Sequence, residues 1–124
     1  MAKIQFRNKA HRDFVFENLE KCRHNDCYHQ AFFYVMGISE ETRMNIGKMF
    51  DFKNDCIVPE GMYGVCHLAF NLWNGFTEEG KENLFTPDEL FCCGYAPYFM
   101  EGIKLRYPEY CRDLTPSKRK DMER

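Results

Sequence analysis

The sequence DCYHQAFFYVMG, residues 26–37, decides the fold of this chain. Asp26 can accept hydrogen bonds from the free amides of a first helical turn, and Gly37 stands where a helix would end. The segment between them is apolar on almost every side, which is typical of a helix that is central in its domain or covered by a partner. A buried strand is the competing interpretation, because a short apolar run fits both structures.

Helical signals recur on both sides of this segment. Asn8 can cap a helix that carries apolar residues at helical spacing, namely Phe14, Val15, Leu19 and Cys22. A second stripe, with i, i+3, i+4, i+7 spacing, predicts a helix at 62–74; its members are Val65, Leu68, Ala69, Leu72 and Trp73.

The strongest local signal is the sequence TPDE at residues 86–89. It combines an N-cap threonine, a proline at the first helical position and a glutamate at the third, which together form a capping box. The helix it starts should end by Gly94. A last helix is expected over 96–106, where Gly102 would allow close helix packing at a propensity cost of about 1 kcal/mol relative to alanine.

These signals predict a mainly α fold, a compact single domain of five or six short helices with room for a minor strand pair. The domain should span residues 1–114 of the 124, a common size for one domain. Residues 115–124 should form a mobile charged tail.

The composition shows an excess of aromatic side chains, with 12 Phe, 7 Tyr and 1 Trp. Twenty rings exceed what one small core needs, so some of them should lie on a binding or self-association surface. The net charge of −2 argues against broad nucleic-acid binding, which usually requires a basic face.

The seven cysteines indicate a reducing compartment. An odd number does not suit a closed disulfide framework, and charges interrupt residues 1–16, so we expect no signal peptide. No stretch approaches the roughly 18 apolar residues of a membrane span. We therefore expect a cytoplasmic protein without membrane contact.

One segment, CRHNDCYH at residues 22–29, contains four residues of the types that bind zinc. Its two cysteines are five positions apart rather than three, and no second Cys or His pair follows at zinc-finger spacing. Ordinary buried cysteines and surface histidines explain the segment better. We therefore expect no metal and no cofactor, and keep a zinc-binding domain as an alternative.

The sequence also lacks the signatures of the common enzyme classes. No cysteine stands in a glycine-flanked elbow, and neither a Walker-type loop nor a GxGxxG motif is present. The paired acidic residues adjoin turns or helix starts, where capping alone explains them. We therefore expect a non-enzymatic protein.

The remaining signals concern surface contacts. A phenylalanine among polar groups on the 62–74 helix, and tyrosines near helix ends, are residue types favoured at interfaces. The candidate contact residues are Tyr28, His29, Phe70, Asn71, Trp73 and Tyr98. As an alternative, His29, Arg43 and Asn71 could hold the polar groups of a nucleotide signal while aromatic rings stack on its base.

Three segments carry a resemblance to a known family: YHQAFFY at 28–34, AFNLWNG at 69–75, and YAPYF at 95–99 continuing into IKLRYPEY at 103–110. Over residues 28–111 the chain resembles a family of short, uncharacterised bacterial proteins from gut Firmicutes and their phages and mobile elements. Members of that family have a longer segment containing Gly, Trp and Thr where this chain has only residues 61–66, so any role of that segment could differ here.

The resemblance implies a bacterial or phage setting. Small, acidic, aromatic-rich proteins of mobile elements are often inhibitors of host defence, including anti-CRISPR proteins. The resemblance therefore favours a binding protein that inhibits a host defence protein, with a host or mobile-element protein as partner. The aromatic surplus makes a homodimer a further expectation.

Overall fold

The computed structural model describes residues 4–61 and 66–111 and is mainly helical. In chain order its elements are α1 (Lys9–Cys22), α2 (Cys27–Met36), α3 (Glu40–Met44), α4 (Ile46–Met49), β1 (Phe50–Asp51), β2 (Cys56–Ile57), η1 (Pro59–Gly61), α5 (Cys66–Asn74), η2 (Glu82–Phe85), α6 (Pro87–Leu90) and α7 (Ala96–Arg106). Within these residues seven α-helices accompany one antiparallel strand pair, which confirms the predicted mainly α class and the minor strand pair. The tail predicted at 115–124, the domain boundary at 114 and the start of the helix predicted at 62–74 lie outside the described residues.

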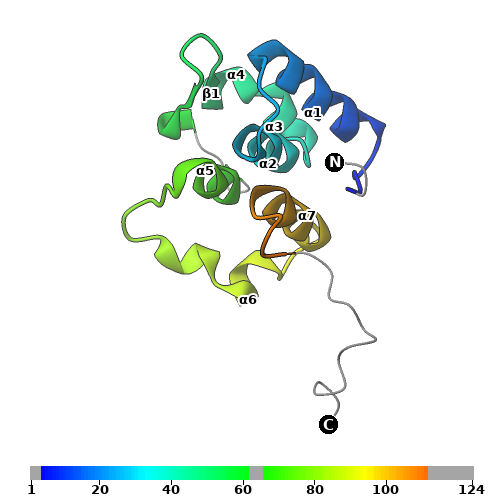
Figure 1. Cartoon of the computed structure of the whole chain (residues 1–124). Helices are drawn as coiled ribbons and strands as arrows, with labels where there is room; N and C mark the ends of the chain where they lie inside the picture. Colours follow the sequence, from blue (N-terminus) through cyan, green and yellow to red (C-terminus); the bar gives the residue numbers. More distant parts are fainter. Residues whose placement is uncertain (1–3, 62–65, 112–124) are drawn as a thin grey trace.

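The segment at 26–37 forms α2, so the strand interpretation is wrong. Residues 31–36 of this helix are all fully buried. The helix contacts α1, α5 and α7, which surround it in Figure 1. The chain therefore covers its own apolar helix on every side, and this helix needs no partner protein for burial.

Aromatic rings fill the space around α2. The ring of Phe32 has four aromatic neighbours with centroids 5.2–5.8 Å away, namely Phe33, Phe50, Phe70 and Trp73. Tilted and edge-to-face pairs of this kind are favourable beyond the area they bury. Much of the aromatic excess thus serves the core.

The helix starts follow the capping signals, with one exception. The side chains of Asn8 and Asp26 accept from the backbone amides of His11 and His29, at 2.8 and 2.9 Å, as predicted. Thr86 does stand at the N-cap of α6, but its hydroxyl donates to the Asn83 carbonyl instead of capping the helix. The capping-box prediction was therefore right about the helix and wrong about the threonine side chain, which is oriented toward the preceding η2 turn and accepts no bond from the amides of α6.

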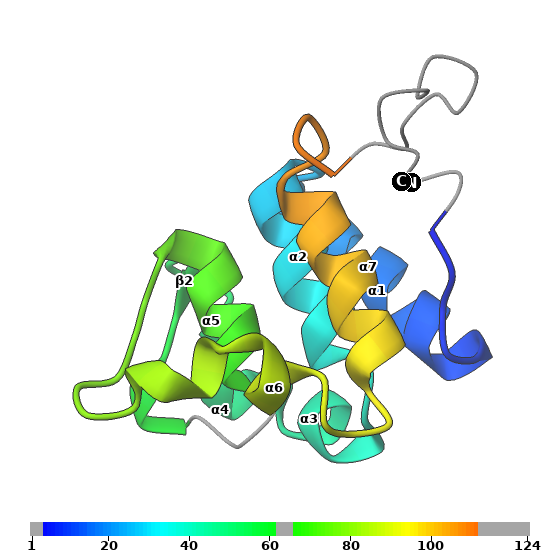
Figure 2. The same cartoon turned by 90° about the horizontal axis from the view of Figure 1, so that it is seen from below.

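Figure 2 shows α6 beside the ends of α5 and α7. The helix α7 also contacts α1, since the ring centroids of Tyr98 and His11 lie 6.3 Å apart. Among the described residues, no helix is long and apolar enough to cross a membrane.

Gly102 allows α7 to approach α2 closely, as the sequence predicted. A Cβ atom at this position would lie 2.7 Å from Cγ2 of Val35, which is fully buried and cannot move aside easily. Close approach at a glycine offsets its unfavourable helix propensity.

The Gly102→Ala substitution should therefore lower the free energy of unfolding by about 1–2 kcal/mol, since the overpacking outweighs the gain in helix propensity. Urea unfolding followed by circular dichroism measures the loss. Gly47→Ala is the matched control, because a Cβ there would meet nothing within 4 Å and should leave stability unchanged or slightly higher. Equal stability of the two variants would show that the α2–α7 contact is looser than described.

Candidate functional site

Three of the predicted contact residues lie together. Tyr28 and His29 occupy the first turn of α2, and the ring of His29 lies 4.7 Å from Trp73 of α5 in an edge-to-face contact. Tyr28 is 44 % exposed, whereas His29 is only 4 % exposed. Trp73 is half-buried and also packs on Phe50 of the core. Only Tyr28 of these three offers a large surface to a partner.

The other three predicted residues lie elsewhere. Phe70 is fully buried against Phe32 and Phe76, so the prediction that it faces outward is wrong. Asn71 donates to the Phe76 carbonyl at 3.2 Å, closing the turn after α5. Tyr98 is partly buried near the start of α7, where it packs against the core.

The residues proposed for nucleotide binding are also dispersed. Arg43 donates to the Gly37 carbonyl at 2.7 Å, at the C-terminal end of α2, whereas His29 lies in its first turn. Eight residues of helix separate these ends by about 12 Å. With Asn71 committed to the turn after α5, the three side chains do not share one pocket.

Beside Tyr28 the structure shows an ordered stack that involves an arginine. The guanidinium carbon of Arg106 lies 4.0 Å from the ring centroid of Tyr28 and 4.6 Å from that of Tyr107. Its Nε donates to the Leu72 carbonyl at 2.8 Å, which fixes the side chain between the two rings. Tyr107 is 38 % exposed, so the stack reaches the surface. We call Tyr28, Arg106 and Tyr107 the aromatic–arginine stack.

A second group of side chains, all polar, surrounds His29 in the first turn of α2. Its Nδ1 lies 2.8 Å from Oδ1 of Asp26, and its Nε2 lies 2.9 Å from Oδ1 of Asp55. A buried imidazole thus has one carboxylate at each ring nitrogen. The ring of His24 stacks on that of His29, with centroids 4.5 Å apart and planes 15° apart.

Cys22 and His24 complete this cluster, which we call the His29 cluster: Cys22, His24, Asp26, His29 and Asp55. His24 lies 3.8 Å from Asp55 through Nε2 and 3.9 Å from Asp26 through Nδ1. Burial, and next the nearby Asp55 carboxylate, raise the pKa of the Cys22 thiol to about 11. Burial opposes ionisation of Asp26, but the hydrogen bonds from the His29 amide and ring outweigh it and lower the pKa of that carboxyl.

Local structure explains how the cluster assembles. Arg23 ends α1 in the left-handed conformation, with φ of 60°, and Asp26 caps α2 only three residues later. This tight corner brings residues 22–29 to one place. Asp55 comes from the turn between β1 and β2, and Phe52 of the same turn stacks on Phe33 of α2 with planes 8° apart. The turn is therefore held against α2, which delivers Asp55 to His29.

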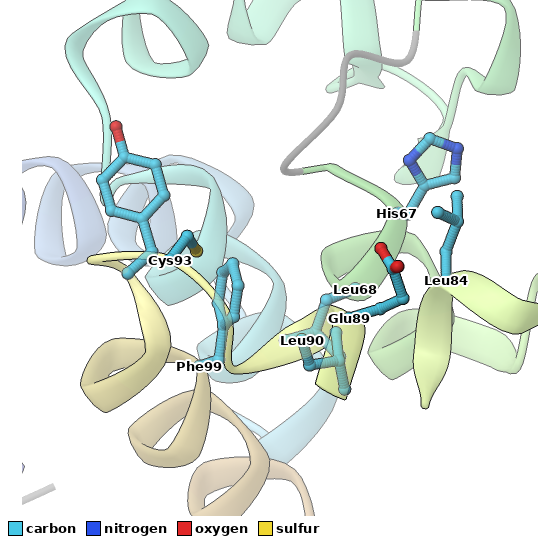
Figure 3. A pocket seen from close by; sticks show the side chains of 8 residues that line it. His67, Leu68, Leu84, Glu89, Leu90, Cys93 and Phe99 are labelled. Carbon is cyan, nitrogen blue, oxygen red and sulfur yellow. The ribbon is translucent and has the colours of Figure 1, made fainter. Parts of the chain in front are cut away.

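A separate cavity of about 270 Å³ lies between α5, α6 and α7. Its walls are mainly apolar, and the lining residues are His67, Leu68, Leu84, Glu89, Leu90, Cys93, Tyr95 and Phe99. Figure 3 shows His67 and Leu84 on one side of this cavity and Cys93 and Phe99 on the other. The cavity is smaller than the roughly 300–1,000 Å³ of typical small-molecule sites.

The comparison with known families supports the expectation of an uncharacterised family. A sequence model described as "Family of unknown function (DUF6075)" matches residues 1–119. The chain belongs to this family. No curated protein and no solved structure matches the chain. This family membership covers nearly the whole chain and carries no assigned activity.

Proposed function

We propose that this protein is a non-enzymatic binding protein and that the aromatic–arginine stack is the centre of its contact surface. The observation that carries the proposal is the fixed position of Arg106 between two exposed tyrosines. Arginine and tyrosine are enriched among the residues that contribute most to binding free energy.

The order of the stack favours binding because less side-chain entropy is lost on association. Arg106 is already held by the Leu72 carbonyl and by two ring faces, so a partner meets it in one conformation. A guanidinium carries five N–H donors. After the bond to Leu72 it can still donate to a carboxylate or a carbonyl group of a partner.

The partner proposed is a host or mobile-element protein, and the effect proposed is inhibition of a host defence protein, such as a CRISPR effector. The proposed partner and the proposed inhibition rest on the resemblance to proteins of gut Firmicutes and their phages. The small size and the net negative charge of the chain support them. A defence protein that binds nucleic acid offers a basic surface, which an acidic protein can approach favourably. The setting proposed is the bacterial cytoplasm.

The double substitution Tyr28→Ala, Tyr107→Ala should weaken partner binding at least tenfold, because it removes both rings that hold and flank Arg106. Partners are first found by affinity enrichment from a bacterium that carries an active CRISPR system. The dissociation constant of each is then measured with purified protein. In parallel, the wild-type protein should raise phage plaquing on that host, and the double variant should not.

The matched control is Met44→Ala, Met100→Ala, which removes two large exposed side chains, 76 % and 52 % exposed, from other parts of the surface. It should bind as tightly as the wild type. A partner that binds both double variants equally well would show that the stack is not the contact surface. Unchanged plaquing with the wild-type protein would exclude inhibition of that defence system.

A further inference from the structure

We propose that the His29 cluster is a binding site for one zinc ion, with Cys22, His24, His29 and Asp55 as ligands and Asp26 as the carboxylate that supports His29. The site is independent of the proposed binding function, and it reverses the expectation from sequence that the chain holds no metal.

Three of the four proposed ligand atoms already lie close together. The Sγ of Cys22, a ring nitrogen of His29 and a carboxylate oxygen of Asp55 all lie within 4.8 Å of one another. His24 joins them through its Nε2, 3.8 Å from Asp55. In a tetrahedral site the ligand atoms lie about 3.3–3.6 Å apart, as follows from Zn–N and Zn–S bonds of about 2.0 and 2.3 Å. Cys22, His29 and Asp55 would therefore need movements of about 1 Å to bind one ion. The half-exposed side chain of His24 would have to turn off the His29 ring, on which it stacks, to bring its Nε2 to the same ion.

The chemistry of the donors selects the metal. A thiolate, two imidazoles and one carboxylate suit zinc, whereas magnesium and calcium prefer oxygen ligands throughout. A cysteine thiolate and the Asp55 carboxylate together balance the charge of a dication. Four protein ligands leave no open position, so the ion would have a structural role rather than a catalytic one.

Asp26 supplies the support that metal-binding histidines usually have. Its Oδ1 lies 2.8 Å from Nδ1 of His29, and its Oδ2 lies 3.9 Å from Nδ1 of His24. Such a carboxylate keeps the hydrogen on Nδ1 and leaves the lone pair of Nε2 for the metal. In both rings Nε2 is the atom that faces Asp55. Asp26 thus orients His29 so that its Nε2 faces Asp55, whereas His24 lies beyond hydrogen-bond distance of Asp26.

The position of the cluster in the fold also suits a metal. Three ligands come from the α1–α2 corner at residues 22–29 and the fourth from the β1–β2 turn, so one ion would join two segments that are distant in the sequence. Trp73 covers the buried edge of His29. His24 is half exposed, so the cluster is open to solvent on that side.

The wild-type protein, freed of metal by a chelator and then titrated with zinc chloride, should bind one zinc ion per chain. Isothermal titration calorimetry and metal analysis after dialysis measure the stoichiometry. Zinc at a hundredfold excess over its Kd should raise Tm by about 10 °C, because the ion binds only the folded chain. Cobalt(II) should give the absorption of a tetrahedral site with a thiolate ligand.

Cys22→Ser and His24→Ala should each weaken zinc binding at least tenfold. His24 suits this test because its side chain is half exposed, so its removal should leave the fold intact. Cys92→Ser is the matched control: it removes an exposed thiol outside the cluster and should bind zinc like the wild type. The cobalt spectrum of the wild type keeps the test decisive if a variant fails to fold.

Two results would overturn the proposal. One is a wild-type protein that neither retains zinc nor gains thermal stability from it. The other is zinc affinity that stays the same in both Cys22→Ser and His24→Ala, or a cobalt spectrum without thiolate ligation, since either would place the ion elsewhere on the chain.

Discussion

Replacing Phe32 with alanine should lower the free energy of unfolding by about 3–5 kcal/mol, a large part of the 5–15 kcal/mol typical of a domain. Phe32 is fully buried in the middle of α2, and its ring contacts four other aromatic rings from α2, β1 and α5. Its removal would leave a cavity that these bulky neighbours cannot fill. Urea unfolding followed by the fluorescence of Trp73, whose ring centroid lies 5.6 Å from that of Phe32, measures the loss.

The matched control is Phe91→Ala, which deletes the same atoms from a side chain that is 40 % exposed. It should cost no more than about 1 kcal/mol. If Phe32→Ala does not fold, Phe32→Leu provides the measurement, with an expected loss of about 1–2 kcal/mol because the smaller side chain leaves a smaller cavity. Similar losses for Phe91→Ala and Phe32→Ala would mean that α2 is not the centre of the core.

The parts of the fold that could be predicted are those that depend on neighbours in the sequence. Asn8 and Asp26 cap α1 and α2 because an N-cap side chain bonds to amides only three residues away. The burial of α2 also follows from local pattern, since a helix that is apolar on all sides has to be enclosed. Phe70 shows the limit of such patterns: one apolar stripe was assigned to α5, but the ring of Phe70 is buried between Phe32 and Phe76 as well.

The candidate sites depend on contacts between distant residues, which the sequence does not reveal. Asp55 meets His29 across 26 positions, and without it the segment at 22–29 has too few ligands at suitable spacing to indicate a metal site. Arg106 bonds to the Leu72 carbonyl across 34 positions. Nothing near Arg106 in the sequence indicates this bond, although the tyrosines that follow it do indicate a surface rich in aromatic groups.

His11 is a buried histidine that no sequence pattern singles out, and it should make stability depend on pH. The side chain is fully buried; its Nδ1 accepts from the Arg7 amide at 3.0 Å, so its Nε2 carries the hydrogen that is donated to the Tyr34 carbonyl at 2.7 Å. This neutral form fits the site. Burial lowers the pKa of His11 to about 4, and the nearby charges of Arg43 and Arg7 act in the same direction. A Cβ at Gly37 would lie 2.8 Å from the imidazole, which shows how tightly it is packed.

Because the unfolded chain takes up a proton on this histidine near pH 6.5 and the folded chain only near pH 4, acid favours unfolding between these values. The contribution of His11 is complete above about pH 6.5 and should be lost as the pH falls to about 4, a total on the order of 3 kcal/mol. Urea unfolding at a series of pH values measures the profile.

The His11→Gln variant should be less stable than the wild type at pH 7 but should lose less stability toward pH 4. The difference between the two stability profiles removes the effect of the carboxyl groups and of the other histidines. Parallel profiles, or an NMR titration of wild-type His11 with a midpoint near 6.5, would show that the folded protein accommodates the charged imidazole.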